Sequence, residues 1–392
     1  MDISLIANEL GISYYPKNFA DFCKSSAPVS ILDRENIEFL DSEYRVFGKY
    51  KTAIFECIEL IEENAALSVW GAYAAAYMRV ATIEDAKHIA VPIISEDSPL
   101  RYYPLLVIAA ALPYGIEKYR ARGFSEDEIK NLLFPAVIER IEKAERDNGK
   151  RGLDMLCYGW LRNYAIASVF RAGAFNITPK FFDEKNVILK NKNTGEIIPL
   201  AVGAFHRTGM VLGSFGFTDT DGAFTADFCE TEDSYIGYPA IDSHTSGKAV
   251  VFPKSEWEIL LKSGDGFGGI HIPVGCDLSE ENIKKSYELA LRITRERYPE
   301  YNAKALACSS WMLDPHLTEL LGESSRISGF LRTFTKYPTK SNGKNIFRFV
   351  FPRKYESYAE LPEDTSLQRK IKELYINGGA IHVYSGIVTG IY

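Results

Sequence analysis

The chain has 392 residues, 46% of them hydrophobic and 25% charged, which is the composition of a folded globular protein and excludes a wholly disordered one. Its 52 acidic residues outnumber its 45 Lys and Arg residues, so the formal net charge is −7. A mildly acidic chain lacks the positive field that non-specific binding to nucleic acid requires, and we expect no nucleic-acid partner. At roughly 100–200 residues per domain, this length predicts two or three domains.

The start of the chain contains an acid, Asp2, and no basic segment, so no secretory signal is predicted. The most apolar run, residues 104–113, is about half as long as a membrane span, and we expect no membrane partner. The six scattered cysteines include no Cys-x-x-Cys pair, so neither a zinc site nor a disulfide framework is indicated. Together these features favour a reducing, cytoplasmic location.

Residues 1–150 are predicted to form a helical N-terminal domain, because their apolar side chains recur at helical spacing. Ser125, followed three residues later by Glu128, has the form of a capping box that starts a helix. We expect that helix to end near Gly149, where we place the domain boundary. The strongest helix candidates cover residues 52–63, 65–81, 102–120 and 126–146.

Residues 151–392 change from helical to strand-rich after one more helix, predicted over residues 156–170. Short β-type runs separated by turn residues then predict a sheet that is largely antiparallel at first. These runs cover residues 173–177, 186–189, 197–204, 209–212, 223–228 and 248–252.

A strand–helix–strand unit follows in the last third of the chain. Residues 269–274 and 303–310 are the strand candidates, and residues 279–298 between them have one apolar and one charged helical face. A crossover of this length predicts that the two strands pair in parallel. After it we expect a helix over 315–321, a strand over 345–351, a helix over 366–375 and a last strand over 379–387.

The order strand, helix, parallel strand, helix and two terminal strands resembles the C-terminal half of the GNAT fold. Several segments are similar to a family of bacterial acyltransferase-domain proteins with a helical N-terminal (N-acyltransferase N-terminal) domain and a GNAT-like C-terminal domain. The matching segments are residues 161–164, 170–173, 264–265, 271–273, 308–315 and 320–334. The resemblance implies an α+β fold: a helical domain, 1–150, and a GNAT-like mixed-sheet domain, 151–392, with one parallel strand–helix–strand unit.

This resemblance also implies a site for acyl-CoA as co-substrate, with no metal. In GNAT enzymes the two central parallel strands splay apart and the pantetheine arm lies between them. The diphosphate lies on amide groups at the start of the following helix, where the helix dipole favours anions. The residues implied to hold the cofactor here are Ile272, Val274, Gly275, Ser279, Ala307 and Ser309.

The implied diphosphate loop, residues 274–279, departs from the family pattern Arg/Gln-x-x-Gly-x-Gly/Ala. It has one glycine and no arginine, and acids lie in or beside it at Asp277, Glu280 and Glu281. Each carboxylate near a diphosphate opposes binding by about 1 kcal/mol even in water. The nearest literal match to the pattern, residues 326–331, does not follow a central strand.

Three side chains are candidates for catalysis: His271, Cys308 and Ser310. An imidazole can take a proton from an acceptor, but hydrogen bonding within a sheet explains His271 equally well. A thiol or hydroxyl beside an imidazole can act as a nucleophile or protonate a leaving thiolate, but small residues at a strand end also serve packing. Strand alternation places Cys308 and Ser310 on one face, and Ser309 and Trp311 on the other.

Other motifs favour structural roles. Asp314 precedes a proline and is most simply a helix N-cap. Residues 264–269 spell G-x-G-x-x-G, but a strand follows where the dinucleotide motif needs a helix, so we interpret these glycines as a turn. His206, Asp242 and His244 lie in different segments without metal-ligand spacing, and no metal site is predicted.

The sequence therefore favours an acyl-CoA-dependent acyltransferase that moves an acyl group to a small amine or hydroxyl acceptor by direct attack, with His271 as the base. The alternative is a non-catalytic ligand-binding or regulatory protein that keeps the GNAT-like fold without binding CoA, which the acidic loop favours. A small-molecule ligand is expected in both cases. The sequence carries no signal for an oligomeric state.

Overall fold

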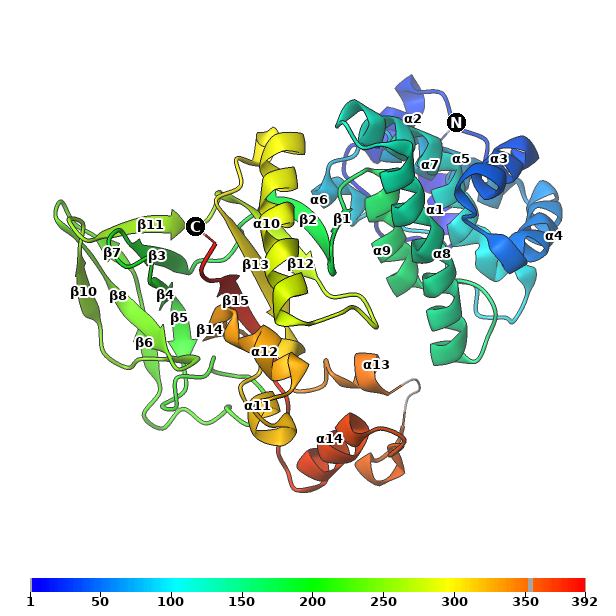
Figure 1. The fold of residues 1–392 in the computed structure, drawn as a ribbon. Helices are drawn as coiled ribbons and strands as arrows, with labels where there is room; N and C mark the ends of the chain where they lie inside the picture. The colour runs from blue at the N-terminus through cyan, green and yellow to red at the C-terminus, as the bar shows by residue number, and fades with distance from the viewer. Residues whose placement is uncertain (1, 352–354, 392) are drawn as a thin grey trace. The chain divides into compact units, whose positions relative to one another are not determined.

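The structure, a computed structural model, describes residues 2–351 and 355–391. The chain divides into two compact units, Met1–Phe170 and Arg171–Tyr392 (Figure 1). The first unit is helical, and the second combines helices with three sheets, so the α+β fold class is confirmed.

The first unit extends beyond the predicted boundary near residue 150, because α9 packs against α7 and α8. The change from helix to strand comes at the end of this unit. Its helices are α1 (Ile3–Glu9), α2 (Phe19–Ser25), α3 (Arg34–Tyr44), α4 (Lys51–Glu62), α5 (Ala65–Met78), α6 (Ile83–Ala86), α7 (Tyr103–Ala121), α8 (Glu126–Asn148) and α9 (Met155–Ala165), with 3-10 turns at Gly48–Tyr50 and Pro99–Tyr102.

Helix α7 runs through the core of this unit, and every residue from Tyr103 to Leu112 is buried. The apolar run that is too short for a bilayer is therefore a core helix. Helix α8 starts at the predicted capping box: the Ser125 side chain accepts from the Glu128 amide, and the Glu128 side chain accepts from the Ser125 amide at 2.8 Å. Among the described residues, no helix is both long and apolar enough to cross a membrane.

The second unit is organised around a six-stranded sheet with the strand order β1-β2-β12-β13-β15-β14. At its centre β12 and β13 run parallel, while β2 pairs antiparallel with β12, and β15 pairs antiparallel with both β13 and β14. The predicted parallel strand–helix–strand unit is thus confirmed within a mixed sheet. The strands are β1 (Phe170–Ala172), β2 (Phe175–Phe181), β12 (Gly266–His271), β13 (Ala305–Ser310), β14 (Phe334–Pro338) and β15 (Tyr384–Val388).

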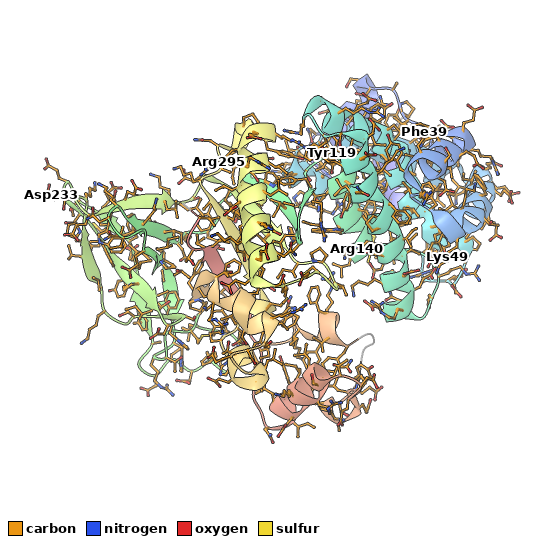
Figure 2. All side chains as sticks on the ribbon, in the orientation of Figure 1. Phe39, Lys49, Tyr119, Arg140, Asp233 and Arg295 are labelled. Atoms are coloured by element: carbon orange, nitrogen blue, oxygen red, sulfur yellow. The ribbon has the colours of Figure 1, made fainter. Side chains whose placement is uncertain are left out.

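Helix α10 (Glu280–Arg297) connects the two parallel strands and lies against one face of both (Figure 1). Its buried residues recur at helical spacing and include Ile283, Tyr287, Ala290, Leu291 and Thr294. Figure 2 shows Arg295 near the C-terminal end of α10, where its Nε donates to the carbonyl oxygen of Ala303 at 3.0 Å. This bond ties the end of the crossover helix to the start of β13.

The opposite face of the central sheet packs on a second sheet with the order β10-β8-β4-β3-β11, and β7 and β9 also pair with β8. One apolar cluster joins the two sheets: Ile188, Ile197 and Leu261 pack with Phe267, Ala305, Ala307, Tyr337 and Ile387. These strands are β3 (Val187–Asn191), β4 (Ile197–Ala201), β7 (Cys229–Glu230), β8 (Ser234–Ile241), β9 (His244–Thr245), β10 (Val250–Pro253) and β11 (Trp257–Leu261), and β5 (Gly203–Phe205) pairs with β6 (Phe224–Ala226).

Residues 345–351 do not form the predicted strand. Their apolar side chains recur at helical spacing, and the segment contains the short helix α13. The ring of Phe347 packs edge-on against Tyr375, with centroids 4.6 Å apart. The edge strand of the sheet is instead β14. The remaining helices are α11 (His316–Leu321), α12 (Arg326–Arg332), α13 (Phe347–Val350) and α14 (Ser366–Ile376), with 3-10 turns at Pro299–Tyr301, Trp311–Leu313 and Tyr358–Glu360.

Candidate active site

The two central parallel strands are hydrogen-bonded over only part of their length. Residues 267–269 of β12 pair with residues 305–307 of β13, and within the described chain the ladder between them ends there. Beyond that point β12 continues to pair with β2, and β13 with β15. Each strand therefore follows its outer neighbour, and residues 270–271 and 308–310 lie beyond the last pair of the parallel ladder. We refer to this region as the ladder gap.

The register assigns the side chains at the ladder gap to the two faces of the sheet. Paired residues of parallel strands point the same way, so alternation beyond the last pair places His271 on the same face as Ser309. Cys308 and Ser310 lie on the opposite face, which α10 covers. The structure therefore brings His271 to the face of Ser309 and does not bring it to Cys308 or Ser310.

The three small residues that end β13 have different surroundings. Cys308 is 4% exposed, and burial raises the pKa of its thiol to about 12, so the thiol stays protonated near neutral pH and is a poor nucleophile. The Ser310 hydroxyl accepts from the amide of Met312 at 3.1 Å. Ser309 is exposed and lies directly at the ladder gap.

The loop after β12 turns sharply before α10. Gly275 has a φ of +73°, in the left-handed region that favours glycine, and the amide of Cys276 donates to the carbonyl oxygen of Pro273 at 3.4 Å. The Asp277 carboxylate accepts from the amide and the hydroxyl of Ser279 at 3.0 and 2.8 Å. Ser279 is therefore engaged with Asp277, and it makes no side-chain cap on the first amides of α10. These amides carry the partial positive charge of a helix N-terminus.

An arginine that the loop itself lacks comes from α12. Arg326 places its Nη1 3.2 Å from Oδ1 of Asp277, and its side chain is 74% exposed. Burial raises the pKa of the Cys276 thiol, and the positive charge of Arg171 opposes this rise. The guanidinium group of Arg171 therefore also lies near the loop. Residues 326–331, the distant match to the family pattern, thus begin beside the loop in space.

A buried carboxylate lies just beyond the carboxyl end of β13. Asp314 is 0% exposed, and its Oδ1 accepts from the backbone amide and the ring Nδ1 of His316, both at 2.9 Å. Its Oδ2 accepts from the backbone amide of His382, just before β15. Burial would raise the pKa of Asp314, but these hydrogen bonds outweigh it and the pKa is lowered, while the bond to Asp314 raises the pKa of His316. The prediction that Asp314 is the N-cap of the following helix is wrong, because the N-cap of α11 is Pro315 and the Asp314 carboxylate joins His316 to the segment before β15.

A second carboxylate, Glu184, joins the two sheets on the face that His271 and Ser309 share. It accepts from the hydroxyl of Tyr337 at 2.8 Å and from that of Ser385 at 3.3 Å. Ser385 is the β15 partner of Ser309. Burial raises the pKa of Glu184. Asn186 also donates to it at 3.2 Å, but Tyr337 and Ser385 lie more than 150 residues away along the chain, so the local sequence did not indicate this network.

The glycines of the G-x-G-x-x-G motif lie mostly within a strand and not in a turn. Gly264 alone has a positive φ, +89°, whereas Gly266 and Gly269 of the motif, and Gly268 between them, belong to β12. A Cβ on Gly266 would overlap the carbonyl oxygen of Tyr301, and one on Gly268 would lie 2.6 Å from Cδ2 of Leu306. These glycines let neighbouring segments approach β12 closely.

The three residues considered as metal ligands do not gather. Nε2 of His206 lies 3.1 Å from Oδ2 of Asp219, and Nδ1 of His244 lies 3.0 Å from the carbonyl oxygen of Asp242. Nowhere in residues 2–351 and 355–391 do three His, Cys, Asp or Glu side chains form a group that could hold a metal ion.

Comparison with known proteins agrees with this architecture. An acyltransferase solved with decanoyl-CoA and teicoplanin has a TM-score of 0.66 and 18% identity, over 99% of each chain. The complex with CoA and 10C-Teicoplanin gives the same values, and a complex with decanoyl-CoA has a TM-score of 0.64 and 19% identity, again over 99% of each chain. At this identity the likeness shows a shared fold, and no curated protein matches the chain.

The family models give a more local match. Residues 202–388 match the GNAT-like C-terminal domain. This range contains the parallel strands, the crossover helix and the ladder gap. The chain therefore carries a GNAT-like C-terminal domain that follows a helical N-terminal unit, as its sequence predicts.

Proposed function

We propose that this protein is an acyltransferase that moves an acyl group from acyl-CoA to a small amine or hydroxyl acceptor by direct attack. The ladder gap is the observation that carries the proposal. Main-chain N–H and C=O groups are strong hydrogen-bonding groups, and those of residues 270–271 and 308–310 lie beyond the end of the parallel ladder. They suit the amide groups of a pantetheine arm, which would bind as an added strand does.

The cofactor would lie along the gap and the loop that follows β12. We assign the pantetheine arm to the main chain of Ile272, Val274, Ala307 and Ser309. The diphosphate would lie on the amides from Gly275 to Ser279 and at the uncapped start of α10, because that end of a helix attracts anions. Arg326 would add a charged donor from α12, in place of the arginine that the loop lacks.

The chemistry needs two proton transfers around the thioester. The acceptor nitrogen or oxygen attacks the carbonyl carbon, the carbon–sulfur bond breaks, and CoA leaves as a thiolate. His271, at the end of β12, is the proposed base that takes the proton of the acceptor. Cys308 and Ser310 remain candidates on the other face of β13, although the buried, protonated thiol of Cys308 favours direct attack over a covalent acyl-cysteine.

The substrate class follows from the solved relatives. Their structures contain CoA or decanoyl-CoA, and two of them also hold teicoplanin or 10C-Teicoplanin. We carry over to this chain only the class of acyl donor, acyl-CoA, and an acceptor with a free amine or hydroxyl group. The six cysteines are unpaired, from which we infer a reducing, cytoplasmic location.

The test is binding followed by turnover. CoA that binds only the folded protein at about 100 times its Kd should stabilise it by ~2.7 kcal/mol, seen as a higher melting temperature. Release of the CoA thiol from octanoyl-CoA in the presence of amines measures transfer. We expect His271→Gln to lose about 100-fold in kcat with an unchanged melting temperature, and His244→Gln, an exposed residue of β9, to lose nothing.

A second candidate function is favoured by the acids at the loop, Asp277, Glu280 and Glu281. In that case the domain keeps the fold as a non-catalytic ligand-binding or regulatory protein. The same melts distinguish the two functions. No shift at millimolar CoA, together with no thiol release, would contradict the acyltransferase and support this alternative.

A further inference from the structure

We propose that His316, held by Asp314, is the general acid that protonates the leaving thiolate of CoA. The inference rests on the proposed acyl transfer and completes its proton balance. In that reaction His271 gains the proton that the acceptor loses, and the sulfur that leaves with the bonding electron pair must gain one. An imidazolium at position 316 supplies it and then takes a proton from solvent, while His271 releases one.

The two histidines lie beyond the two strands that border the ladder gap. His271 is the last residue of β12, and His316 starts α11 shortly after the end of β13. Both strands run in the same direction, so both imidazoles belong to the carboxyl end of the sheet, where the ladder is open. We place the thioester at this end of the sheet, with His271 at the end of β12 and His316 after the end of β13.

The contacts of Asp314 define which ring atom carries the proton. Nδ1 of His316 donates to the carboxylate at 2.9 Å, which leaves Nε2 as the atom that exchanges a proton with a ligand. Asp314 is 0% exposed, while the side chain of His316 is 52% exposed. A buried carboxylate behind a half-exposed imidazole orients the ring and stabilises its charged form, and the exposed ring can be reprotonated by solvent.

The other groups at the end of β13 are weaker acids. Burial raises the pKa of Cys308 to about 12, above the ordinary thiol value of about 8.5, so its proton is held more tightly than that of a free thiol. The Ser310 hydroxyl already accepts from Met312. An imidazolium is a stronger acid than an ordinary alkyl thiol in water and can protonate an alkyl thiolate without a large energetic cost.

The charged and titratable groups around His316 favour its protonated form. Asp314 raises the pKa of His316 through a hydrogen bond and its charge, and Glu319 of α11 adds a smaller contribution in the same direction. On the far side of Asp314, His382 has its Nδ1 3.8 Å from Oδ2, and the hydroxyls of Tyr375 and Tyr384 lie near enough for the carboxylate to raise their pKa values. An acid must be protonated to act, so kcat should fall as pH rises through the raised pKa of His316.

The experiment measures acyl transfer by the full chain, with octanoyl-CoA and an amine, as a function of pH. We expect His316→Gln to lose about 100-fold in kcat, with the KM for octanoyl-CoA unchanged and the alkaline limb of the pH profile abolished. Added imidazole should restore part of the rate of His316→Ala. Asp314→Asn keeps an acceptor oxygen for the backbone amides, and as a positioning change it should move the alkaline limb to lower pH. His244→Gln should behave as the native protein.

Each result separates the two proposals. A native alkaline limb in His316→Gln, or a lower rate that imidazole does not restore in His316→Ala, would assign His316 a structural role and overturn the inference while acyl transfer stands. No CoA binding and no thiol release by the native protein would overturn both. Because His316 is half exposed, its variants are expected to fold, and they decide the question even where Asp314→Asn melts early.

Discussion

Both halves of the β12–β13 pair contain small residues, but these residues serve opposite purposes in the two halves. In the paired half, Gly266 and Gly268 remove side chains, so that residues 305–307 and the turn after α10 approach closely. In the open half, residues 270–271 pair with β2 and residues 308–310 pair with β15, beyond the end of the parallel ladder. The paired half requires that the two strands approach closely, whereas the open half requires that they separate.

Because of this difference, we expect substitutions in the paired half to reduce stability and substitutions in the open half to reduce function. In the paired half a side chain added at Gly266 meets the backbone of Tyr301, and one added at Gly268 meets the buried side chain of Leu306. In the open half Ser309 is exposed, so a larger side chain there meets solvent or a ligand. Substitutions in the two halves should therefore separate folding from binding.

The largest expected effect is on folding, from Gly266→Val in the paired half. Its Cβ would overlap the carbonyl group of Tyr301, and overpacking of this kind costs about 3 kcal/mol or more. For a chain of this size that lowers the melting temperature by about 4 °C. The control is Gly275→Ala in the exposed loop, where a Cβ meets nothing within 4 Å and only the positive φ costs about 1 kcal/mol. Equal melting temperatures for the two variants would contradict the close packing described here.

The next effect is on binding, from Ser309→Trp in the open half. Ser309 is exposed, so we expect the melting temperature to stay close to the native value. The indole would fill the ladder gap, and the affinity for CoA measured by calorimetry should fall at least about tenfold, or ~1.4 kcal/mol. Val250→Trp, at an exposed position of β10 in the other sheet, is the matched control and should bind CoA normally. Unchanged affinity in Ser309→Trp would place the cofactor elsewhere.

A smaller change tests the charges at the loop. Asp277→Asn removes one carboxylate from the proposed diphosphate site and releases Arg326, so we expect CoA to bind about fivefold more tightly. Arg326→Gln should weaken binding by a similar factor. Both effects should shrink at high salt because the groups are exposed. Arg332→Gln, on the same helix but paired with Glu323, is the control. Tighter binding in Arg326→Gln would reverse the assignment.

The elements around the gap could be predicted because their signals are long and regular. α10 has an apolar stripe over its whole length, and its length allowed only a parallel pairing of β12 and β13. Short apolar runs were ambiguous: residues 345–351 read as a strand but contain α13, and β14 was missed. A run of this length fits a helix and a strand equally well until its packing partners are known.

The side chains at the site were harder to predict than the elements, because their partners are distant in the chain. Arg326 reaches Asp277, and Asp314 holds His382, across 49 and 68 residues. The face on which His271 lies depends on the register, and a shift of one residue would place it with Cys308 instead of Ser309. Alternation along the sequence divides the side chains of one strand between its two faces. Only the register with the neighbouring strand shows which side chains of the two strands share a face.

The smallest expected effect concerns Glu184, which borders the face that Ser309 shares. Burial raises its pKa above the ordinary 4.5, so the folded state binds this proton more tightly than the unfolded state. This contribution to stability is fully present below pH 4.5 and is lost as pH rises through the raised pKa. Glu184→Gln should abolish that part of the pH dependence of the melting temperature, whereas Glu258→Gln, at an exposed position of β11, should retain it. If Glu184→Gln instead lowers kcat at every pH without changing the melting temperature, the carboxylate acts on the acceptor side of the gap and not only between the sheets.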